Sequence, residues 1–213
     1  FRNARVIGRR FKLVHVHFGR EIIEVATFRA NHPQGDEDED SNLSSRNESG
    51  RILRDNVYGS LEDDAQRRDF TINALYLDAS CERILDYANG VHDIRNRLVR
   101  LIGDPEKRYQ EDPVRMLRAV RFAAKLDFEI EKHSAAPIPR LARLLHEIPS
   151  ARLFEEVLKL FLAGNAEYTF ELLLEYDLFA PLFPAAAAAL KRDPEYAGEL
   201  IRLALASTDR RIE

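Results

Sequence analysis

The spacing of the hydrophobic residues changes along this sequence, and that change limits the possible folds more than any other feature. Residues 11–28 contain two runs rich in β-branched residues with Gly19-Arg20 between them, which predicts a β-hairpin. Later apolar residues recur every three or four positions in four segments: residues 111–126, 139–149, 150–164 and 167–179. The sequence therefore predicts an α+β fold, in which a β-hairpin and a helix precede an all-helical part.

The two patterns meet near residue 105, which predicts two domains. A chain of 213 residues with 45% hydrophobic residues can bury one large core or two small ones. Short β-rich pieces and turns at residues 82–103 are typical of a connector, and the polar residues 31–50 predict a mobile loop. We therefore expect one domain over residues 1–104 and a helical domain over residues 105–213.

Composition excludes several classes of protein. Cys81 is the only cysteine, so no disulfide forms within the chain and no multi-cysteine zinc site exists, which favours a reducing compartment. No apolar run approaches the roughly 20 residues of a membrane helix, and Phe1 does not open a signal-peptide pattern. These features predict a soluble, cytoplasmic protein with no membrane partner.

Charge is unevenly distributed, although the formal net charge is only −4. Residues 1–12 carry five basic side chains and no acid: Arg2, Arg5, Arg9, Arg10 and Lys12. This basic edge can face phosphate groups or form an ordinary charged surface, and the sequence favours neither. His15 and His17 share one face of a strand, but no third ligand is near, so a structural role is favoured over metal binding.

Residues 64–75 are predicted to form a helix whose interior carries charge. Asp69 and Asn73 are four residues apart and share a face of such a helix, with Arg67 and Arg68 within one turn. Arginine forks pair with phosphate oxygens and a carboxylate accepts from ribose hydroxyls, so this cluster can hold a nucleotide. The alternative is a solvated face with local ion pairs, and spacing alone favours that alternative.

The predicted helix at residues 111–126 has two distinct faces. One is a polar stripe ending in an aromatic ring: Glu111, Arg115, Arg118 and Phe122. The other is apolar: Met116, Leu117, Val120, Ala123 and Ala124. Glu111 and Asp112 precede Pro113 and so suit the start of a helix. Alternatively, Asp112 and Arg115 present a paired acceptor and donor to the edge of a base. The residues alone leave both interpretations open.

Glu24 stands in an otherwise apolar row of the second predicted strand, together with Ile22, Ala26 and Phe28. A lone carboxylate in such a row is a metal ligand or base at the rim of an active site, or it lies at an exposed edge. No glycine loop of the P-loop type occurs in the sequence, so classical NTPase chemistry is not supported.

Several of these segments together resemble the class II nucleotidyltransferases, the family of bacterial poly(A) polymerases and CCA-adding enzymes. The matching strings are RNARVIGRRFKLVHV (2–16), EIIEVATFR (21–29), RRDFTINALY (67–76), LIGDPEKRYQEDPVRMLRAVRFAAKL (101–126) and ARLFEEVLKL (151–160). The resemblance covers nearly all of residues 1–184. The string ILRDNVYGSLEDDAQRRDFTINALY at residues 52–76 is most similar to the poly(A) polymerase branch.

The resemblance implies roles for nine residues. It places six in nucleotide binding: Arg68, Asp69, Asn73, Asp112, Arg115 and Arg118. Within this set, RRDFTIN resembles the motif that contacts ribose and triphosphate, and EDPVR resembles the motif that selects the incoming base. Arg152 and Glu155 resemble the segment that braces the base-selecting helix. Glu24 falls where a further carboxylate supports the catalytic metal pair, so the resemblance implies a catalytic and metal-binding role for it.

The family's glycine-rich loop and Asp-x-Asp pair, which bind two Mg²⁺ ions, precede the position that corresponds to Phe1. We therefore expect this chain to be an inactive fragment of an enzyme that adds AMP from ATP to RNA 3′ ends. The resemblance also implies a role in mRNA processing and RNA turnover, with RNA-decay proteins as partners. The alternatives are CCA addition to tRNA, and a non-catalytic RNA-binding module that lacks the metal-binding carboxylates.

Overall fold

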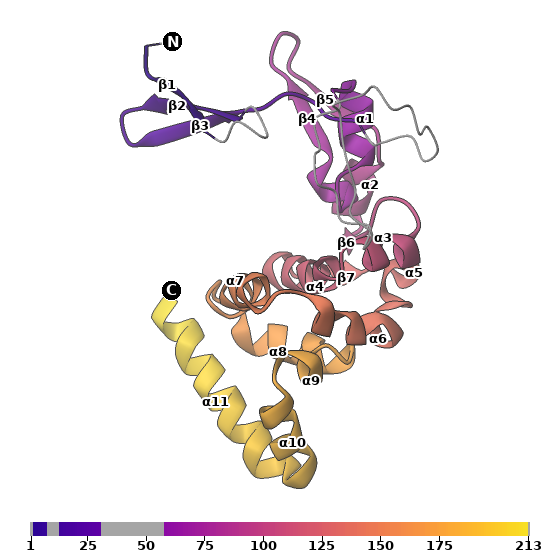
Figure 1. Cartoon of the computed structure of the whole chain (residues 1–213), viewed down its shortest axis with the longest axis vertical. Coiled ribbons are helices and arrows are strands. Elements are labelled where there is room, and N and C mark those ends of the chain that lie inside the picture. The colour runs from indigo at the N-terminus through magenta and orange to yellow at the C-terminus, as the bar shows by residue number, and fades with distance from the viewer. Residues whose placement is uncertain (1, 8–12, 31–57, 213) are drawn as a thin grey trace. The chain divides into compact units, whose positions relative to one another are not determined.

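A computed structural model describes residues 2–7, 13–30 and 58–212 of the chain (Figure 1). The chain divides into two compact units, Phe1–Arg68 and Asp69–Glu213. The described residues of the first unit form strands and a short helix, and the second unit is mostly helical. The predicted α+β class is confirmed. The predicted loop at residues 31–50 lies outside the described residues.

The first unit holds a three-stranded antiparallel sheet in the order β1-β2-β3, with β1 at Ala4–Ile7, β2 at Leu13–Phe18 and β3 at Glu21–Val25. The predicted hairpin is confirmed as β2–β3. Gly19 makes its turn with φ +61°, a conformation that favours glycine. Strand β1 was not predicted, because the basic residues around it obscure the alternation of apolar and polar side chains.

Helix α1, at Leu61–Gln66, begins with a reciprocal cap. The Ser60 hydroxyl accepts from the Asp63 backbone N–H at 3.1 Å, and the Asp63 carboxylate accepts from the Ser60 backbone N–H at 2.8 Å. The Ser60 hydroxyl also donates to the Asp63 carboxylate at 2.7 Å. This bond, followed by the bond from the Ser60 backbone N–H, holds the pKa of Asp63 below its usual range. The predicted helix over residues 64–75 is therefore wrong in its bounds, since the helix begins earlier and ends at Gln66.

The second unit opens with an extended segment. Asp69 and Phe70 are followed by a 3₁₀ helix, η1, at Thr71–Asn73 and by strand β4 at Leu75–Asp78. Backbone bonds tie the segment to residues 100–102: the Ile102 N–H donates to the Asp69 carbonyl at 2.8 Å, and the Thr71 N–H donates to the Arg100 carbonyl at 3.0 Å. These hydrogen bonds between distant segments of the chain replace the i,i+4 backbone bonds of the predicted helix.

Residues predicted to form a connector hold defined elements: β5 at Arg83–Asp86, α2 at Gly90–Arg95 and β6 at Leu98–Val99. β5 pairs with β4, and β6 pairs in parallel with β7 at Glu129–Ile130. Helix α2 packs closely on η1, because a Cβ at Gly90 would stand 2.3 Å from the Thr71 carbonyl oxygen. Glycine is therefore required at this position.

The helical part consists of α3 (Pro105–Glu111), α4 (Val114–Leu126), α5 (Lys132–Ala135), α6 (Ile138–Leu141), 3₁₀ helix η2 (Ala142–Glu147), α7 (Ser150–Phe161), α8 (Ala166–Glu175), α9 (Phe179–Leu182), α10 (Pro184–Arg192) and α11 (Pro194–Ile212). The predicted helices at 150–164 and 167–179 correspond to α7 and α8. The helix predicted over residues 139–149 is divided between α6 and η2. The helix predicted over residues 111–126 is interrupted at Asp112-Pro113, because α3 ends and α4 begins there.

The core of the second unit surrounds α4. Its predicted apolar face is confirmed, since all five predicted residues are at most 4% exposed: Met116, Leu117, Val120, Ala123 and Ala124. Helices α7 and α8 pack against α4. Phe70 is fully buried in the same core, with its ring edge-on to Phe122 at 5.5 Å between centroids. The core therefore fixes both α4 and the segment just after Asp69.

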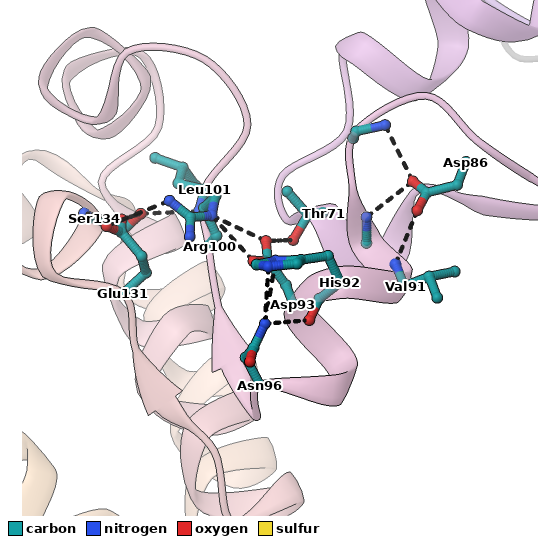
Figure 2. Close-up of polar contacts among 12 residues, drawn as sticks. Thr71, Asp86, Val91, His92, Asp93, Asn96, Arg100, Leu101, Glu131 and Ser134 are labelled. Atoms are coloured by element: carbon teal, nitrogen blue, oxygen red, sulfur yellow. Dashed lines mark hydrogen bonds and ion pairs between the residues drawn. The ribbon is translucent and has the colours of Figure 1, made fainter.

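A buried polar network joins η1 to α5 (Figure 2). The Asp93 carboxylate, only 1% exposed, accepts from the Thr71 hydroxyl at 2.8 Å and from Arg100 Nε at 3.0 Å. Arg100 Nη1 also lies 3.3 Å from Glu131 Oε1. Glu131 in turn caps α5 by accepting from the Ser134 N–H at 3.1 Å. The segment that follows Asp69 is thus held by polar contacts as well as by Phe70.

None of the helices in the described ranges is long and apolar enough to cross a membrane.

Candidate functional site

Two predicted site residues of the second unit, Asn73 and Arg118, contact the carboxylate of a third, Asp69. Asp69 Oδ1 accepts from the Phe70 N–H at 2.8 Å and from Asn73 Nδ2 at 3.1 Å. Asp69 Oδ2 lies 2.5 Å from Arg118 Nη2 of α4. The structure thus brings Asp69 and Asn73 together as predicted, but it does so through an extended segment and η1. The Asp69 side chain remains 10% exposed.

Asp112 lies in the break between α3 and α4, with an extended backbone at φ −148° and ψ 93°. Its Oδ1 accepts from the Val114 N–H at 3.3 Å, as expected for a residue at a helix start. Its Oδ2 accepts from Arg152 Nη2 of α7 at 2.7 Å. The structure therefore brings Arg152 to Asp112, and both side chains are partly exposed.

Arg115, in the first turn of α4, is held by the last turn of α3. Its Nη1 donates to the Arg108 carbonyl at 2.7 Å and to Glu111 Oε2 at 3.2 Å. Arg108 Nη1 donates to the same Glu111 oxygen at 3.2 Å. Burial and the nearby charge of Arg115 lower the pKa of the Arg108 guanidinium. The sequence interpretation missed Arg108, whose position outside the polar stripe gave no signal.

Helix α7 presents a different acid from the one predicted. Glu155 is exposed, whereas Glu156 is 7% exposed and its carboxylate lies 3.8 Å from Arg121 Nε of α4. Lys159 Nζ donates to the same carboxylate at 2.8 Å. Glu156 lies four residues after Arg152, and this i,i+4 spacing is the signal that identifies the face toward α4.

In the first unit, Arg68 binds an acid that the prediction did not select. Arg68 Nη2 lies 3.0 Å from Asp64 Oδ2, and Arg67 Nε lies 3.0 Å from Asp64 Oδ1. Asp64 is 3% exposed and also accepts from the Arg29 N–H at 3.2 Å. A buried carboxylate that accepts from these three residues orients both arginines, while the Arg68 side chain remains 44% exposed.

Glu24 lies on β3 directly opposite His15 of β2, and its Oε1 is 3.2 Å from His15 Nε2. The Glu24 side chain is 65% exposed. Among the residues that the structure describes, no three His, Cys, Asp or Glu side chains are grouped to hold a metal ion. Glu24 with its histidine therefore does not form a magnesium site by itself, and no catalytic step through a metal follows from these residues.

The basic edge is only partly described. Arg2, Arg5 and His17 line a depression of about 370 Å³ beside β1, and Arg5 is opposite His15 in the register. Residues 8–12, with the other three predicted basic residues, lie outside the described ranges.

The acid–arginine pairs of the second unit are suited to binding rather than to covalent chemistry. Asp69 and Asp112 are carboxylates near the surface, each beside an arginine, and both can accept from hydroxyl or amino groups. Arg115 and Arg118 donate in the planar fork that suits phosphate oxygens and base edges. These side chains supply no activated nucleophile, so their chemistry is positioning and charge compensation.

Two family models match the chain. Residues 1–100 match the model described as "Poly A polymerase head domain", and residues 127–190 match the model described as "Probable RNA and SrmB- binding site of polymerase A".

Curated relatives are similar over the whole chain. Poly(A) polymerase I of Salmonella typhimurium is 55% identical over 213 residues, which is 100% of this chain and 45% of that protein. Poly(A) polymerase I of Haemophilus influenzae is 52% identical over 99% of this chain and 46% of that protein. A CCA-adding enzyme of Lactobacillus helveticus is 36% identical over 80% of this chain and 40% of that protein. The chain thus spans less than half the length of these relatives.

Solved structures share the fold. The CCA-adding enzyme of Bacillus stearothermophilus in complex with CTP superposes with a TM-score of 0.67 at 32% identity, covering 84% of this chain and 40% of that one. A tRNA nucleotidyltransferase complexed with a primer tRNA and an incoming ATP analog gives a TM-score of 0.66 at 26% identity, covering 85% of this chain and 47% of that one.

Proposed function

Because the chain belongs to the nucleotidyltransferase family of bacterial poly(A) polymerases and CCA-adding enzymes, we propose that the whole protein adds AMP from ATP to RNA 3′ ends. The observation that carries this proposal is the 55% identity to Poly(A) polymerase I over the full chain. The pairing of Asp112 with Arg152 and of Arg115 with Glu111 supports a preformed site for a nucleotide base.

Asp112 and Arg115 are proposed to select adenine. A carboxylate accepts from the adenine amino group, and a guanidinium donates to a ring nitrogen, so the pair matches one edge of the base. Each side chain already has a partner that fixes its direction, Arg152 for Asp112 and Glu111 for Arg115. Such preorganisation reduces the ordering needed on binding.

Asp69, Asn73, Arg68 and Arg118 are proposed to bind the ribose and the triphosphate. Asn73 and the Phe70 N–H both donate to Asp69 Oδ1, so Oδ2, beside Arg118, is the oxygen with acceptor capacity for a ribose hydroxyl. Arg68 carries a half-exposed guanidinium whose direction is set by Asp64, as suits a phosphate contact.

In the proposed reaction, the RNA 3′-hydroxyl attacks the α-phosphate in line and pyrophosphate leaves. The residues of this chain hold the base, sugar and phosphates in position and compensate charge. The family resemblance also implies magnesium. Glu24 is proposed to contribute one carboxylate to its site in the whole protein, and Arg152 to brace the base-selecting residues. The proposed role of Glu155 has less support than the same role for Glu156, which contacts α4.

RNA is the proposed macromolecular partner, which the match of residues 127–190 to an RNA-binding family model supports. Four further proposals rest on the sequence and the family resemblance. They are a domain boundary between residues 104 and 105, a cytoplasmic location, a role in mRNA processing, and RNA-decay proteins as partners.

CCA addition to tRNA is the second candidate, because the chain also resembles a CCA-adding enzyme solved with CTP. Primer extension with the full-length protein separates the two. ATP or CTP is supplied in turn, with magnesium, on a generic RNA and on tRNA lacking its terminal CCA. Long ATP-dependent products on generic RNA are expected. A short CTP-dependent product confined to tRNA would establish CCA addition, and absence of product with every combination would favour a non-catalytic RNA-binding module.

The base-selecting role is tested by Asp112→Asn in the full-length protein. We expect the preference for ATP over the other triphosphates to fall by about tenfold, since one good base contact contributes about 1–3 kcal/mol of discrimination. RNA affinity should be unchanged. Asp127→Asn is the matched control, because Asp127 is an exposed acid at the other end of α4. Equal losses of ATP preference and RNA affinity would reject the role.

A further inference from the structure

The relative placement of Asp112 and Arg115 depends on how α3 is held against α4. Asp112 follows the last residue of α3, whereas Arg115 lies in the first turn of α4. They are three residues apart, but the helix is interrupted between them. The Arg115 N–H donates to the Asp112 carbonyl at 3.0 Å, which links the two backbones across the break. The directions of the two side chains are set by side-chain contacts.

The contacts across the break converge on Glu111, the last residue of α3. Glu111 Oε2 accepts from Arg115 Nη1 and from Arg108 Nη1, each at 3.2 Å. Arg115 Nη1 also donates to the Arg108 carbonyl at 2.7 Å. One arginine thus supplies both a backbone acceptor for Arg115 and a second positive charge on the carboxylate that Arg115 uses.

Arg108 is the least exposed member of this group. Its side chain is 14% exposed, compared with 17% for Arg115 and 45% for Glu111. Two guanidinium groups share one carboxylate, so removal of the Glu111 charge leaves them to repel each other. Removal of the Arg108 charge frees Glu111 to turn toward solvent, and Arg115 then keeps only the carbonyl contact.

We propose that Arg108, acting through Glu111, is a positioning residue that fixes the direction of the Arg115 guanidinium and thereby sets nucleotide selectivity. The proposal rests on the proposed function of Arg115 as a base-selecting residue. Arg108 needs no contact with the nucleotide for this role, because its effect passes through the shared Glu111 oxygen.

The test uses the full-length protein with Arg108→Met and Glu111→Gln, which remove one charge each at similar volume. The values of kcat/KM for ATP, CTP, GTP and UTP are measured on one RNA primer. Both variants should lower the ratio of preferred to other nucleotides by about tenfold, as expected for the loss of a charge-assisted contact. The KM for the RNA primer should not change. Arg108→Lys, which retains the charge, should restore most of the ratio.

Glu106→Gln is the matched control, because Glu106 lies on the same helix and its carboxylate pairs with Arg140, 2.5 Å from Nη2. This control should retain the wild-type ratio. The proposal would be overturned if Arg108→Met and Glu111→Gln had the same nucleotide ratio as the control. It would also be overturned if kcat/KM fell equally for all four nucleotides. If Arg108→Met does not fold, Glu111→Gln decides, since its side chain is partly exposed. If the wild-type protein prefers CTP, the poly(A) function is contradicted. The role of Arg108 is then still tested by the ratio of kcat/KM for the preferred nucleotide to that for the others.

Discussion

Helix α4 and the segment Asp69–Leu75 both carry polar groups at four-residue spacing, and the sequence predicts a helix for both. Only α4 is an α-helix. It presents a continuous apolar face to α7 and α8, including Leu117 and Val120 at 0% exposure. The other segment buries Phe70 in extended conformation and forms backbone bonds with residues 100–102. Polar spacing alone therefore did not determine helix formation, whereas a full apolar face did.

The largest effect should come from removing part of that apolar face. Leu117→Ala leaves a cavity beneath α4 and should lower the free energy of unfolding by about 3 kcal/mol. Ile72→Ala in η1 should lower it by only about 1 kcal/mol, because Ile72 is partly exposed. Urea unfolding followed by circular dichroism measures both. Equal losses would show that η1 depends on apolar burial as much as α4 does.

The next effect concerns the polar network that holds η1. Asp93→Asn removes one of the two carboxylates that pair with Arg100, leaving Glu131, and weakens the contact with Thr71. The free energy of unfolding should fall by about 2 kcal/mol. Asp127→Asn, in the exposed pair with Arg97, should change it by less than about 0.5 kcal/mol. If the two variants are equally stable, the Asp93 network does not hold the segment after Asp69.

The comparison also explains which parts of the structure were predictable. Periodicity predicted α4, α7 and α8, because each has a repeating apolar pattern that faces the core. Two β-branched runs on either side of Gly19 predicted the β2–β3 hairpin, although every residue of β3 is exposed. Periodicity did not predict the extended segment at Phe70, because the bonds that hold it come from residues about 30 positions later in the chain.

The candidate site shows the same division. Asp69 with Asn73, and Asp112 near Arg115, were found from sequence because each group lies within a few residues. Asp64, Arg108 and Glu156 were missed. Asp64 is a buried residue of α1, Arg108 lies on the helix before the break, and Glu156 lies one position after the acid that was selected. Their importance depends on contacts that local spacing does not specify.

A smaller, pH-dependent change in stability should distinguish the hydrogen bonds between Asp86 and the start of α2 from the contacts of the apolar core. Burial alone would raise the pKa of Asp86, but backbone N–H groups of Val91, Gly90, Ala88 and Asn89 outweigh it and hold the pKa below its ordinary 3.8. A carboxyl group whose pKa is lower in the folded state stabilises the fold at pH values above its unfolded-state pKa. That stabilisation is lost as the pH falls through the folded-state pKa.

The urea midpoint of the wild type should therefore fall as pH is lowered from 5 to about 3. Asp86→Asn should reduce that pH dependence while lowering the midpoint at pH 7. Leu117→Ala should retain the full pH dependence, since it alters only apolar contacts. An unchanged pH profile in Asp86→Asn would mean that other carboxylates account for the acid sensitivity.

The smallest expected change tests whether α4 would continue into α3 without its proline. Proline disfavours a helical backbone at the preceding residue, which is Asp112. Pro113→Ala removes that restriction and adds freedom to the unfolded chain, so stability should fall by about 0.5–1 kcal/mol. Because Arg152 and the Val114 N–H still bind Asp112, we expect the break to persist, with unchanged helical circular dichroism and nucleotide selectivity. Pro105→Ala, at the start of α3, is the matched control and should show the same small loss. A rise in helical signal with lower selectivity in Pro113→Ala alone would show that proline, rather than the contacts of Asp112, keeps the two helices apart.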